Sequence, residues 1–211
     1  MKTKRKPKIL FVDIETAPIR VLAWDLKTYG YTPVNMLNKD RRIISFAAKL
    51  QGKSKGYQYD LRKGVTKKNE RNLLERLSYV LNDADVVVTQ NGKKFDVKVI
   101  KGRLAVHRLP PIKNFEQFDT LKEAKKQFNL PSYSLEYVSQ TFCRKYKKLQ
   151  HKAFPGIDLW KECLRGNRKA WQEMAKYNIH DVLALEEWYD ILLPYCIDTL
   201  TPKRLKVLLE D

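Results

Sequence analysis

Hydrophobic and polar positions change period several times along this chain, and each change predicts a new element. The apolar residues 9–12 predict a buried strand that ends near Thr16, because Pro18 cannot continue it. Residues 43–50 and 57–61 predict two more strands, joined through glycines as an antiparallel hairpin. The chain therefore opens with a meander of strands.

Helical spacing begins after this meander. Thr66 is placed to cap a helix whose apolar face ends near Asn82, and residues 85–89 then predict a β-branched core strand. The remaining pattern predicts a helix over 94–108, a strand over 115–121, and helices over 122–128, 134–142 and 158–164. A last helix, capped by Asn167, is predicted to run to about Leu193, before Pro194. Strands that form a meander and then alternate with helices indicate a mixed α/β fold with a partly parallel sheet.

The segment from 19 to 42 shows no sustained period. We expect a long loop or a partly helical insertion there, near the end of the first strand, and long loops in compact domains are often functional. No linker or internal repeat divides the chain. We therefore predict one domain over residues 9–197, between a basic flexible arm, residues 1–8, and a C-terminal tail, residues 198–211.

Basic residues outnumber acidic ones, with 42 Lys and Arg against 24 Asp and Glu, which gives a net charge of +18. Clustered cations bind phosphates by displacing counterions, so this charge favours nucleic acid as the partner. A basic surface that serves only solubility is the alternative. A membrane surface is disfavoured, because the cations do not gather on one face of a single helix.

Three cysteines at wide spacings fit neither a disulfide framework nor a zinc site, and they indicate reduced thiols. The first apolar run is too short for the core of a signal peptide or for a membrane span. We therefore expect a soluble cytoplasmic protein. The basic arm is open to three interpretations, which are nuclear import in a eukaryote, contact with phosphates, and solubility.

Two carboxylates end the first strand. Asp13 and Glu15 are separated by one residue, so that both point to the same side of the strand. Acids on a shared face repel each other unless a cation lies between them, and Mg²⁺ and Mn²⁺ prefer oxygen ligands. The pair predicts a divalent metal site, with incidental acids at a solvated strand end as the alternative.

Two later segments offer partners for this pair. Asn91 and Asp96 lie between the fourth strand and the start of the helix that follows it. Capping of this helix is an equal alternative role for Asp96, and a turn position is an equal alternative for Asn91. Tyr177 and Asp181 are four residues apart on the last helix and therefore share a face. An ordinary surface position is the alternative for that pair.

These segments together resemble the DEDD superfamily of 3′–5′ exonucleases. The residues that carry the resemblance are Asp13, Glu15, Asp96, Tyr177 and Asp181. Their last motif is similar to the tyrosine (DEDDy) branch, because Lys176 occupies the position of the histidine in the other branch. The resemblance spans residues 9 to about 195 and looks closest to stand-alone enzymes, many of them from bacteriophages, that are similar to the proofreading domains of family B DNA polymerases. Stretches that also look like motifs of that group are 118–121, 133–135 and 158–161.

The resemblance implies an RNase H-like fold, with a five-stranded mixed sheet flanked by helices, in the cytoplasm of a bacterial host or a phage-infected cell. It also implies hydrolysis of phosphodiester bonds with two Mg²⁺ or Mn²⁺ ions. Asp13 would bridge both ions, Glu15 and Asp181 would complete one site, and Asp96 would hold the second ion. Tyr177 would orient the attacking water, because a phenol of ordinary pKa is a poor base at neutral pH.

The candidates for substrate contacts are Thr16, Asn91, Phe95, Tyr146, Lys147 and Lys148. By the resemblance, Asn91 and Phe95 would contact the terminal nucleotides, although Phe95 is equally explained as a core residue of its helix. The basic loop around Tyr146 has the composition of a single-strand groove, or of a solvated charged loop. Asp119 is expected to cap the following helix or support the site, ahead of binding metal itself.

The expected substrate is single-stranded or frayed DNA, with RNA open as a second substrate and a separate polymerase or replication protein as a partner. Three alternatives stay open. The chain could be a nucleic-acid-binding module without turnover, a structural protein that contacts nucleic acid through its charge, or an endonuclease of the same fold.

Overall fold

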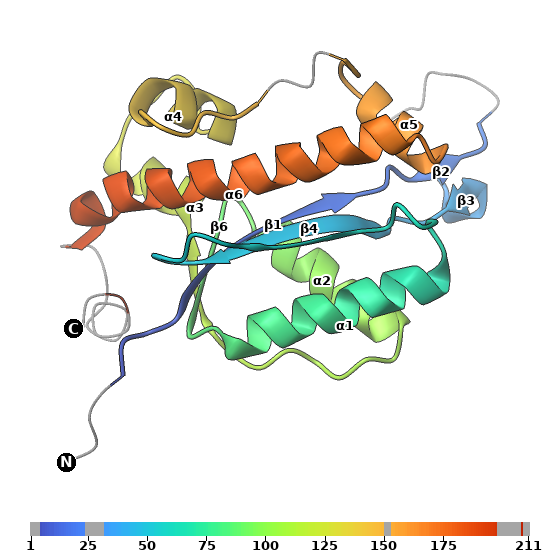
Figure 1. Ribbon diagram of the computed structural model, residues 1–211, viewed down its shortest axis with the longest axis horizontal. Helices are drawn as coiled ribbons and strands as arrows, with labels where there is room; N and C mark the ends of the chain where they lie inside the picture. The colour runs from blue at the N-terminus through green and yellow to red at the C-terminus, as the bar shows by residue number, and fades with distance from the viewer. Residues whose placement is uncertain (1–4, 24–31, 150–152, 198–207, 209–211) are drawn as a thin grey trace.

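The computed structural model describes residues 5–23, 32–149, 153–197 and 208, and these form a mixed sheet with helices on both faces (Figure 1). The strand order in the sheet is β5, β4, β1, β6, β7. The bounds are Ile9–Thr16 for β1, Ile43–Leu50 for β4, Tyr57–Asp60 for β5, Val86–Thr89 for β6 and Glu116–Asp119 for β7. The predicted five-stranded mixed sheet is confirmed.

The central strand β1 pairs differently on its two sides. It runs antiparallel to β4 over residues 10–16 but pairs in parallel with β6 only over residues 9–11. The last residues of β1 therefore have no neighbouring strand on the β6 side. Ligands of α/β sheets bind at such carboxyl ends of central strands, and here the end carries Asp13 and Glu15.

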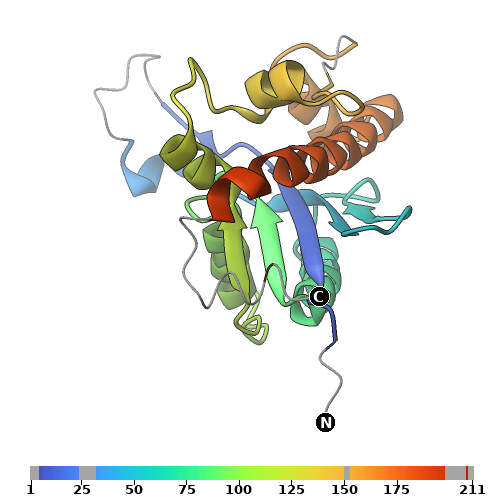
Figure 2. The ribbon, with the colours of Figure 1, turned by 90° about the vertical axis from the view of Figure 1, so that its left-hand side faces the viewer.

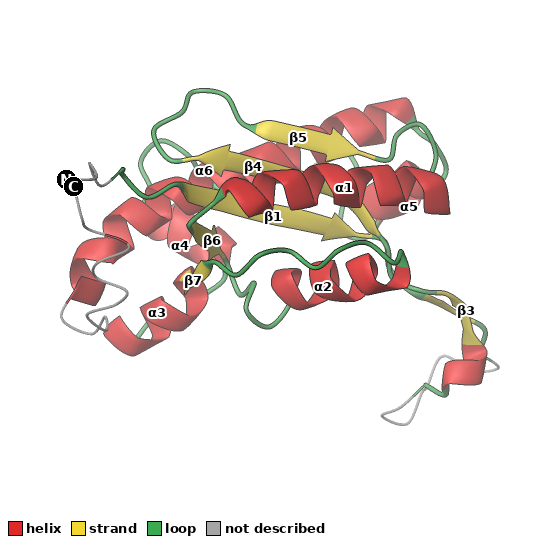
Figure 3. Cartoon of the chain, turned by 90° about the horizontal axis from the view of Figure 1, so that it is seen from below, coloured by secondary structure: helices red, strands yellow, loops and turns green. Residues whose placement is uncertain are grey.

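Helices cover both faces of the sheet. α6 crosses over one face (Figure 2), whereas α1 and α2 lie in front of the strands when the molecule is seen from below (Figure 3). The bounds are Lys67–Asp83 for α1, Asp96–Val106 for α2, Thr120–Gln127 for α3, Leu135–Phe142 for α4, Asp158–Leu164 for α5 and Arg168–Cys196 for α6.

Side chains of β1 alternate between two hydrophobic clusters. Leu10 and Val12 pack with residues of α1 and α2, whereas Ile9 and Phe11 pack with α6, where Phe11 meets Tyr189 edge to face with ring centroids 5.4 Å apart. The same alternation continues to the end of the strand. It directs Asp13 and Glu15 toward the α6 face, as the spacing predicted.

Local signals set most element boundaries correctly. The Thr66 hydroxyl accepts a hydrogen bond from the amide of Asn69 at 3.1 Å, and the Asn167 side chain caps α6. The β4–β5 hairpin forms as predicted, and α5 has the predicted bounds. These elements depend on contacts within a few residues, which the sequence displays directly.

The predicted end of the last helix before Pro194 is wrong, because α6 continues to Cys196. Proline inside a helix removes one backbone hydrogen bond. Here the final turn stays helical because Cys196 is buried in the core and the ring of Tyr195 packs on Phe128, with centroids 5.1 Å apart. Tertiary packing offsets the lost hydrogen bond.

The segment from 19 to 42 contains strands that its sequence did not predict. Arg20–Val21 forms β2 and Leu37–Lys39 forms β3, and the two pair as a small antiparallel sheet, with the 3₁₀ turn η1 (Val34–Met36) before β3. The expected helical content is therefore limited to that turn among the described residues. Strands of two and three residues are too short to show a period in sequence.

Parts of the chain with sequence-based expectations lie outside the described residues, namely 1–4, 24–31, 150–152 and the tail except Leu208. Of the basic arm, Arg5 pairs with Asp85 at 2.8 Å and Lys8 with Asp83 at 2.6 Å. Among the described helices, none is both long and apolar enough to cross a membrane.

A buried charge network joins α1 to α2. Both carboxylate oxygens of Glu70 accept hydrogen bonds from Arg103 at 2.8 Å, and His107 Nε2 lies 2.9 Å from Glu70 Oε2. Glu70 also accepts the backbone amide of Ile43, and Arg103 reaches Asp40 at 3.0 Å. The network therefore ties both helices to the start of β4.

Replacing Glu70 with Ala should lower the free energy of unfolding by about 3–5 kcal/mol, because Arg103 loses its partner inside the protein. The matched control is Glu75→Ala on the same helix, which removes an exposed pair with Arg71 and should cost less than about 1 kcal/mol. Urea denaturation measures both values. Equal costs for the two variants would contradict a stabilising role of the network.

Candidate functional site

Asp13 is held by a polar pair from two other elements. The side-chain amide of Asn178, on α6, donates to Asp13 Oδ2 at 2.5 Å and lies 3.3 Å from the Asp13 carbonyl. The hydroxyl of Ser45, on β4, donates to the side-chain oxygen Oδ1 of Asn178 at 2.8 Å. This chain of hydrogen bonds fixes the orientation of the Asp13 carboxylate.

Sequence reasoning missed Asn178 and Ser45. Asn178 directly follows Tyr177, and its position between Tyr177 and Asp181 was the feature of the sequence that could have indicated a role in the site. Ser45 lies in a strand that reads as apolar, so its role depends on a contact across 133 residues. No local pattern reveals such a contact.

Glu15 contacts the helix α5. The indole nitrogen of Trp160 donates to Glu15 Oε2 at 3.2 Å. Trp160 belongs to the stretch 158–161 that resembles a family motif, although sequence analysis assigned it no role. Its ring also meets Tyr177 edge to face, with centroids 6.3 Å apart. Trp160 therefore links the strand end to the last helix.

The structure brings Asp181 of α6 to the two acids of β1. One carboxylate oxygen from each of Asp13, Glu15 and Asp181 lies within 4.8 Å of the others. Asp181 and Tyr177 are both buried, and the Tyr177 hydroxyl hydrogen-bonds to Asp181. The predicted shared face of these two residues is confirmed, whereas the alternative of ordinary surface positions is wrong.

Lys148 enters the acidic cluster from the basic loop. Its Nζ lies 3.0 Å from Asp181 Oδ2 and 4.9 Å from the centroid of the Tyr177 ring. Lys147, the neighbouring candidate, is exposed. Of these two candidates, Lys148 contacts an acid of the cluster, whereas Lys147 has no such contact among the described residues.

Asp96 lies beside this cluster but is not one of its three converging acids. It is buried at the first position of α2, and its carboxylate accepts hydrogen bonds from its own amide and from that of Ile14, at the unpaired edge of β1. Phe95, not Asp96, is the N-cap residue. The negative charge of Asp96 nevertheless reaches Asp13, whose pKa it helps to raise.

Asp119 organises the turn that precedes Asp96. Its carboxylate accepts the amides of Asn91 at 2.9 Å, Lys93 at 3.1 Å and Lys122 at 3.3 Å. The expected capping role is confirmed, because the Lys122 amide belongs to the first turn of α3. Asn91 adopts a left-handed conformation with φ 62°, which fits its predicted turn position.

Other candidates for substrate contacts occupy varied places. Thr16 and Phe95 are half-buried near the strand end and the start of α2, and Phe95 packs under Arg41, 5.3 Å from the ring centroid. Tyr146 packs against the hydrophobic cluster that contains Ile9 and Phe11, and its ring meets that of His180 edge to face, with centroids 5.9 Å apart. The end of that loop, His151 and Lys152, lies outside the described residues.

Burial and mutual repulsion raise the pKa values of the acids in the site. Burial raises the pKa of Glu15 to about 8, with a further contribution from Asp181. Burial also raises the pKa of Asp96 to about 7 and that of Asp13, where Glu15 adds to the effect. Burial alone would lower the pKa of Lys148, but Asp181 raises it, so that this lysine stays charged.

The donor set fits a divalent cation. Asp181 Oδ1 is buried and has no hydrogen-bond partner among the described residues, although it lies in a cluster of acids. Buried acceptors are normally satisfied, and a cation bound by Asp13, Glu15 and Asp181 would satisfy this one. A set of protein ligands made only of carboxylate oxygens is typical of sites for Mg²⁺ and Mn²⁺.

A model of the RNase_H superfamily matches residues 10–193 of this chain. DNA polymerases of Thermococcus litoralis and Thermococcus aggregans are each 24% identical over 196 residues, which cover 80% of this chain and 11% and 10% of those proteins. The family B DNA polymerase from Pyrobaculum calidifontis matches in structure with a TM-score of 0.60 at 16% identity, covering 92% of this chain and 25% of that one. The predicted RNase H-like fold is confirmed, and the chain spans about a tenth of the curated relatives it matches.

Without metal, the protein should lose stability as the pH rises from about 4.5 to about 8. Glu15 has an ordinary pKa of 4.5 and a folded pKa of about 8, so between these values the folded state binds the extra proton and each rise in pH favours unfolding. Glu15→Gln should flatten this fall, and Glu75→Gln should not. Unfolding temperatures in chelator at pH 5, 6.5 and 8 measure the effect. The same slope in Glu15→Gln and wild type would contradict the assignment.

Proposed function

Because this chain belongs to the RNase_H superfamily, we propose that residues 9–197 form a metal-dependent nuclease that removes nucleotides from the 3′ end of a DNA strand. The observation that carries the proposal is the convergence of Asp13, Glu15 and Asp181 within 4.8 Å, beside the buried Asp96. The fold shared with a family B DNA polymerase supports the nuclease class, and the sequence motifs support the 3′–5′ direction.

Four acids would hold two ions in this proposal. Asp13 would be the shared ligand, Glu15 and Asp181 would complete one site, and Asp96 would hold the second ion. Such ions, when bound, stabilise negative charge on the phosphate that is cut. Asn178 and Trp160 orient the carboxylates by hydrogen bonds, and preoriented ligands bind metal without reorganisation.

Tyr177 would position the attacking water. Burial raises the pKa of its hydroxyl, with a contribution from Asp181, so the phenol keeps its proton at neutral pH and acts as a hydrogen-bond partner and not as a base. Lys148 lies over its ring and beside Asp181. The phenol is therefore fixed between an acid and a cation that face the proposed reaction centre.

The substrate in this proposal is single-stranded or frayed DNA, with RNA as a second candidate. The net charge of +18 favours a polyanion. Asn91, Phe95 and Thr16 lie on the turn and strand end that border the acids and would contact the terminal nucleotides. The exposed Lys147 and the nearby Tyr146 would contact the strand further away. A separate polymerase is a proposed partner.

Incubation with 5′-labelled single-stranded DNA and Mg²⁺ or Mn²⁺ should yield a ladder that shortens from the 3′ end. Asp13→Ala should reduce the rate by at least about 1,000-fold, because the shared ligand is lost, and chelator should stop the reaction. Glu75→Ala, at an exposed acid on α1, is the control and should leave the rate unchanged. Internal cuts, or degradation that survives Asp13→Ala, would refute the exonuclease, and binding without shortening would leave a binding protein.

Tyr177→Phe should lower kcat by about 100-fold with little change in KM, because only the alignment of water is lost. Metal binding, measured as the rise in unfolding temperature with Mn²⁺, should stay close to that of wild type. The exposed Tyr195 on the same helix provides the control Tyr195→Phe. An unchanged kcat in Tyr177→Phe would remove the positioning role.

A further inference from the structure

A small basic pocket lies where the β2–β3 sheet meets the end of β1. Its volume is about 160 Å³, and its lining includes Ala17, Arg20, Lys39, Asp40, Arg42 and Leu164. This volume is below the roughly 300–1,000 Å³ of typical small-molecule sites. The pocket is therefore suited to a group of a few atoms and not to a whole nucleotide.

The charge of this pocket is positive. Its acid, Asp40, is already engaged by Arg103 at 3.0 Å and by the backbone amide of Arg41 at 2.7 Å. Arg20 and Lys39 have no ion-pair partner among the residues that the structure describes, and both are exposed. Arg42 donates to the carbonyl of Val65. Cations thus remain available to an anion that enters the pocket.

The pocket adjoins both halves of the acidic site. Ala17 follows Glu15 by two residues, and its amide donates to the carbonyl of Arg42 at 2.8 Å. On the other side, Arg41 lies over the ring of Phe95, which directly precedes Asp96. Figure 1 shows the small β2–β3 sheet beyond the carboxyl end of β1, the strand end that carries Asp13 and Glu15.

Backbone pairing and the buried network hold the pocket in place. Arg20 and Lys39 are register partners in the β2–β3 sheet, so their Cα atoms are fixed relative to each other. Asp40 is anchored through Arg103 to Glu70, which is fully buried. Preformed cationic sites lose less entropy on binding than mobile ones.

We propose that this pocket binds one backbone phosphate of the nucleic-acid strand at a fixed distance from the bond that is cut. The inference rests on the proposed function, since it assumes a strand whose end lies at the acids. Arginine provides paired N–H donors that match phosphate oxygens, and lysine adds a point charge. The pocket would hold the strand and set its register.

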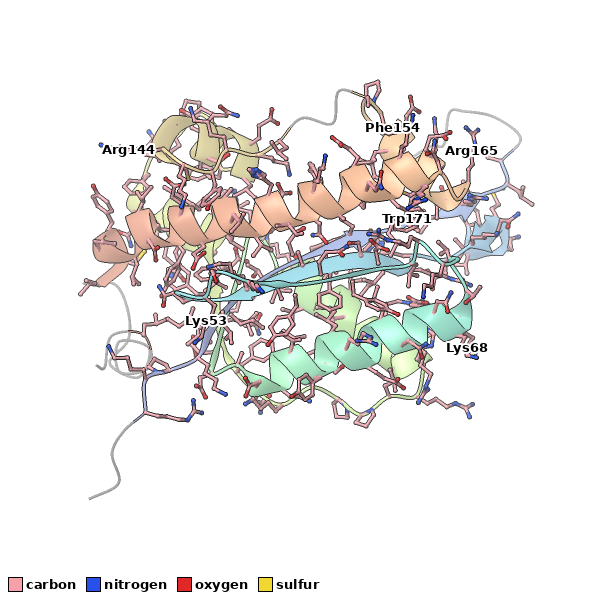
Figure 4. The ribbon with its side chains drawn as sticks, viewed as in Figure 1. Lys53, Lys68, Arg144, Phe154, Arg165 and Trp171 are labelled. Carbon is pink, nitrogen blue, oxygen red and sulfur yellow. The ribbon has the colours of Figure 1, made fainter. Side chains whose placement is uncertain are left out.

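Binding of a 5′-fluorescent single-stranded oligonucleotide in chelator, where no cleavage occurs, tests this site. The double variant Arg20→Gln with Lys39→Gln should weaken binding about 10-fold and lower the slope of log Kd against log salt by about 0.7, as expected for one lost phosphate contact on a single strand. The control double variant Lys53→Ala with Lys55→Ala, in the β4–β5 turn at the other end of the molecule (Figure 4), should change neither. Equal effects of the two double variants would overturn the proposal.

Neutral methylphosphonate linkages, placed one at a time from the 3′ end, locate the phosphate. One position should weaken binding to wild type and have no effect on the Arg20→Gln, Lys39→Gln protein, because the contact is already lost. Losses of equal size in both proteins at every position would overturn the proposal. So would displacement of the oligonucleotide by millimolar inorganic phosphate alone, which would indicate a site for the free ion.

The two proposals fail separately. If wild type shortens DNA from the 3′ end but no linkage shows the coupling, the phosphate site is wrong and the exonuclease stands. If the coupling appears but no shortening occurs, the phosphate site stands and the exonuclease is wrong. Unfolding temperatures of the double variants confirm that both remain folded.

Discussion

Repulsion among enclosed carboxylates at the end of β1 is the constraint on which the rest of the site depends. Carboxylate oxygens of Asp13, Glu15 and Asp181 converge within 4.8 Å, and the negative charge of Asp181 helps to raise the pKa values of Asp13 and Glu15. Each of these acids accepts a hydrogen bond from a neighbouring side chain, and Asp181 accepts a second one from Tyr177. Asn178 serves Asp13, Trp160 serves Glu15 and Lys148 serves Asp181. Asp181 Oδ1 is buried without a hydrogen-bond partner among the described residues, and a bound cation would satisfy this oxygen.

The long helix α6 makes this arrangement rigid. One end buries Trp171, which Figure 4 shows on the side of the helix that faces the sheet, and the other end buries Trp188 and Tyr189 in the second cluster. Tyr177 and Asp181 lie between these anchors. A site built on an element that is packed at both ends keeps its geometry better than one on a loop.

Opposite charges are separated over a short distance around the acids. A polyanionic strand would be repelled by the acidic cluster alone, so cations at its border are needed to bring phosphates close. The loop with Lys147 and the β2–β3 pocket with Arg20 and Lys39 supply such cations on different segments.

The sequence by itself determined where the five strands of the main sheet and the helices α1 to α6 lie along the chain, the shared face of Asp13 and Glu15, and that of Tyr177 and Asp181, because strand and helix periods are local properties. Only the tertiary structure decided that Lys148 contacts Asp181, that Asn178 and Trp160 orient the acids, and that α6 continues past Pro194. It also placed β2 beside β3. These outcomes depend on contacts between residues far apart in the chain, and such contacts leave no period in the sequence.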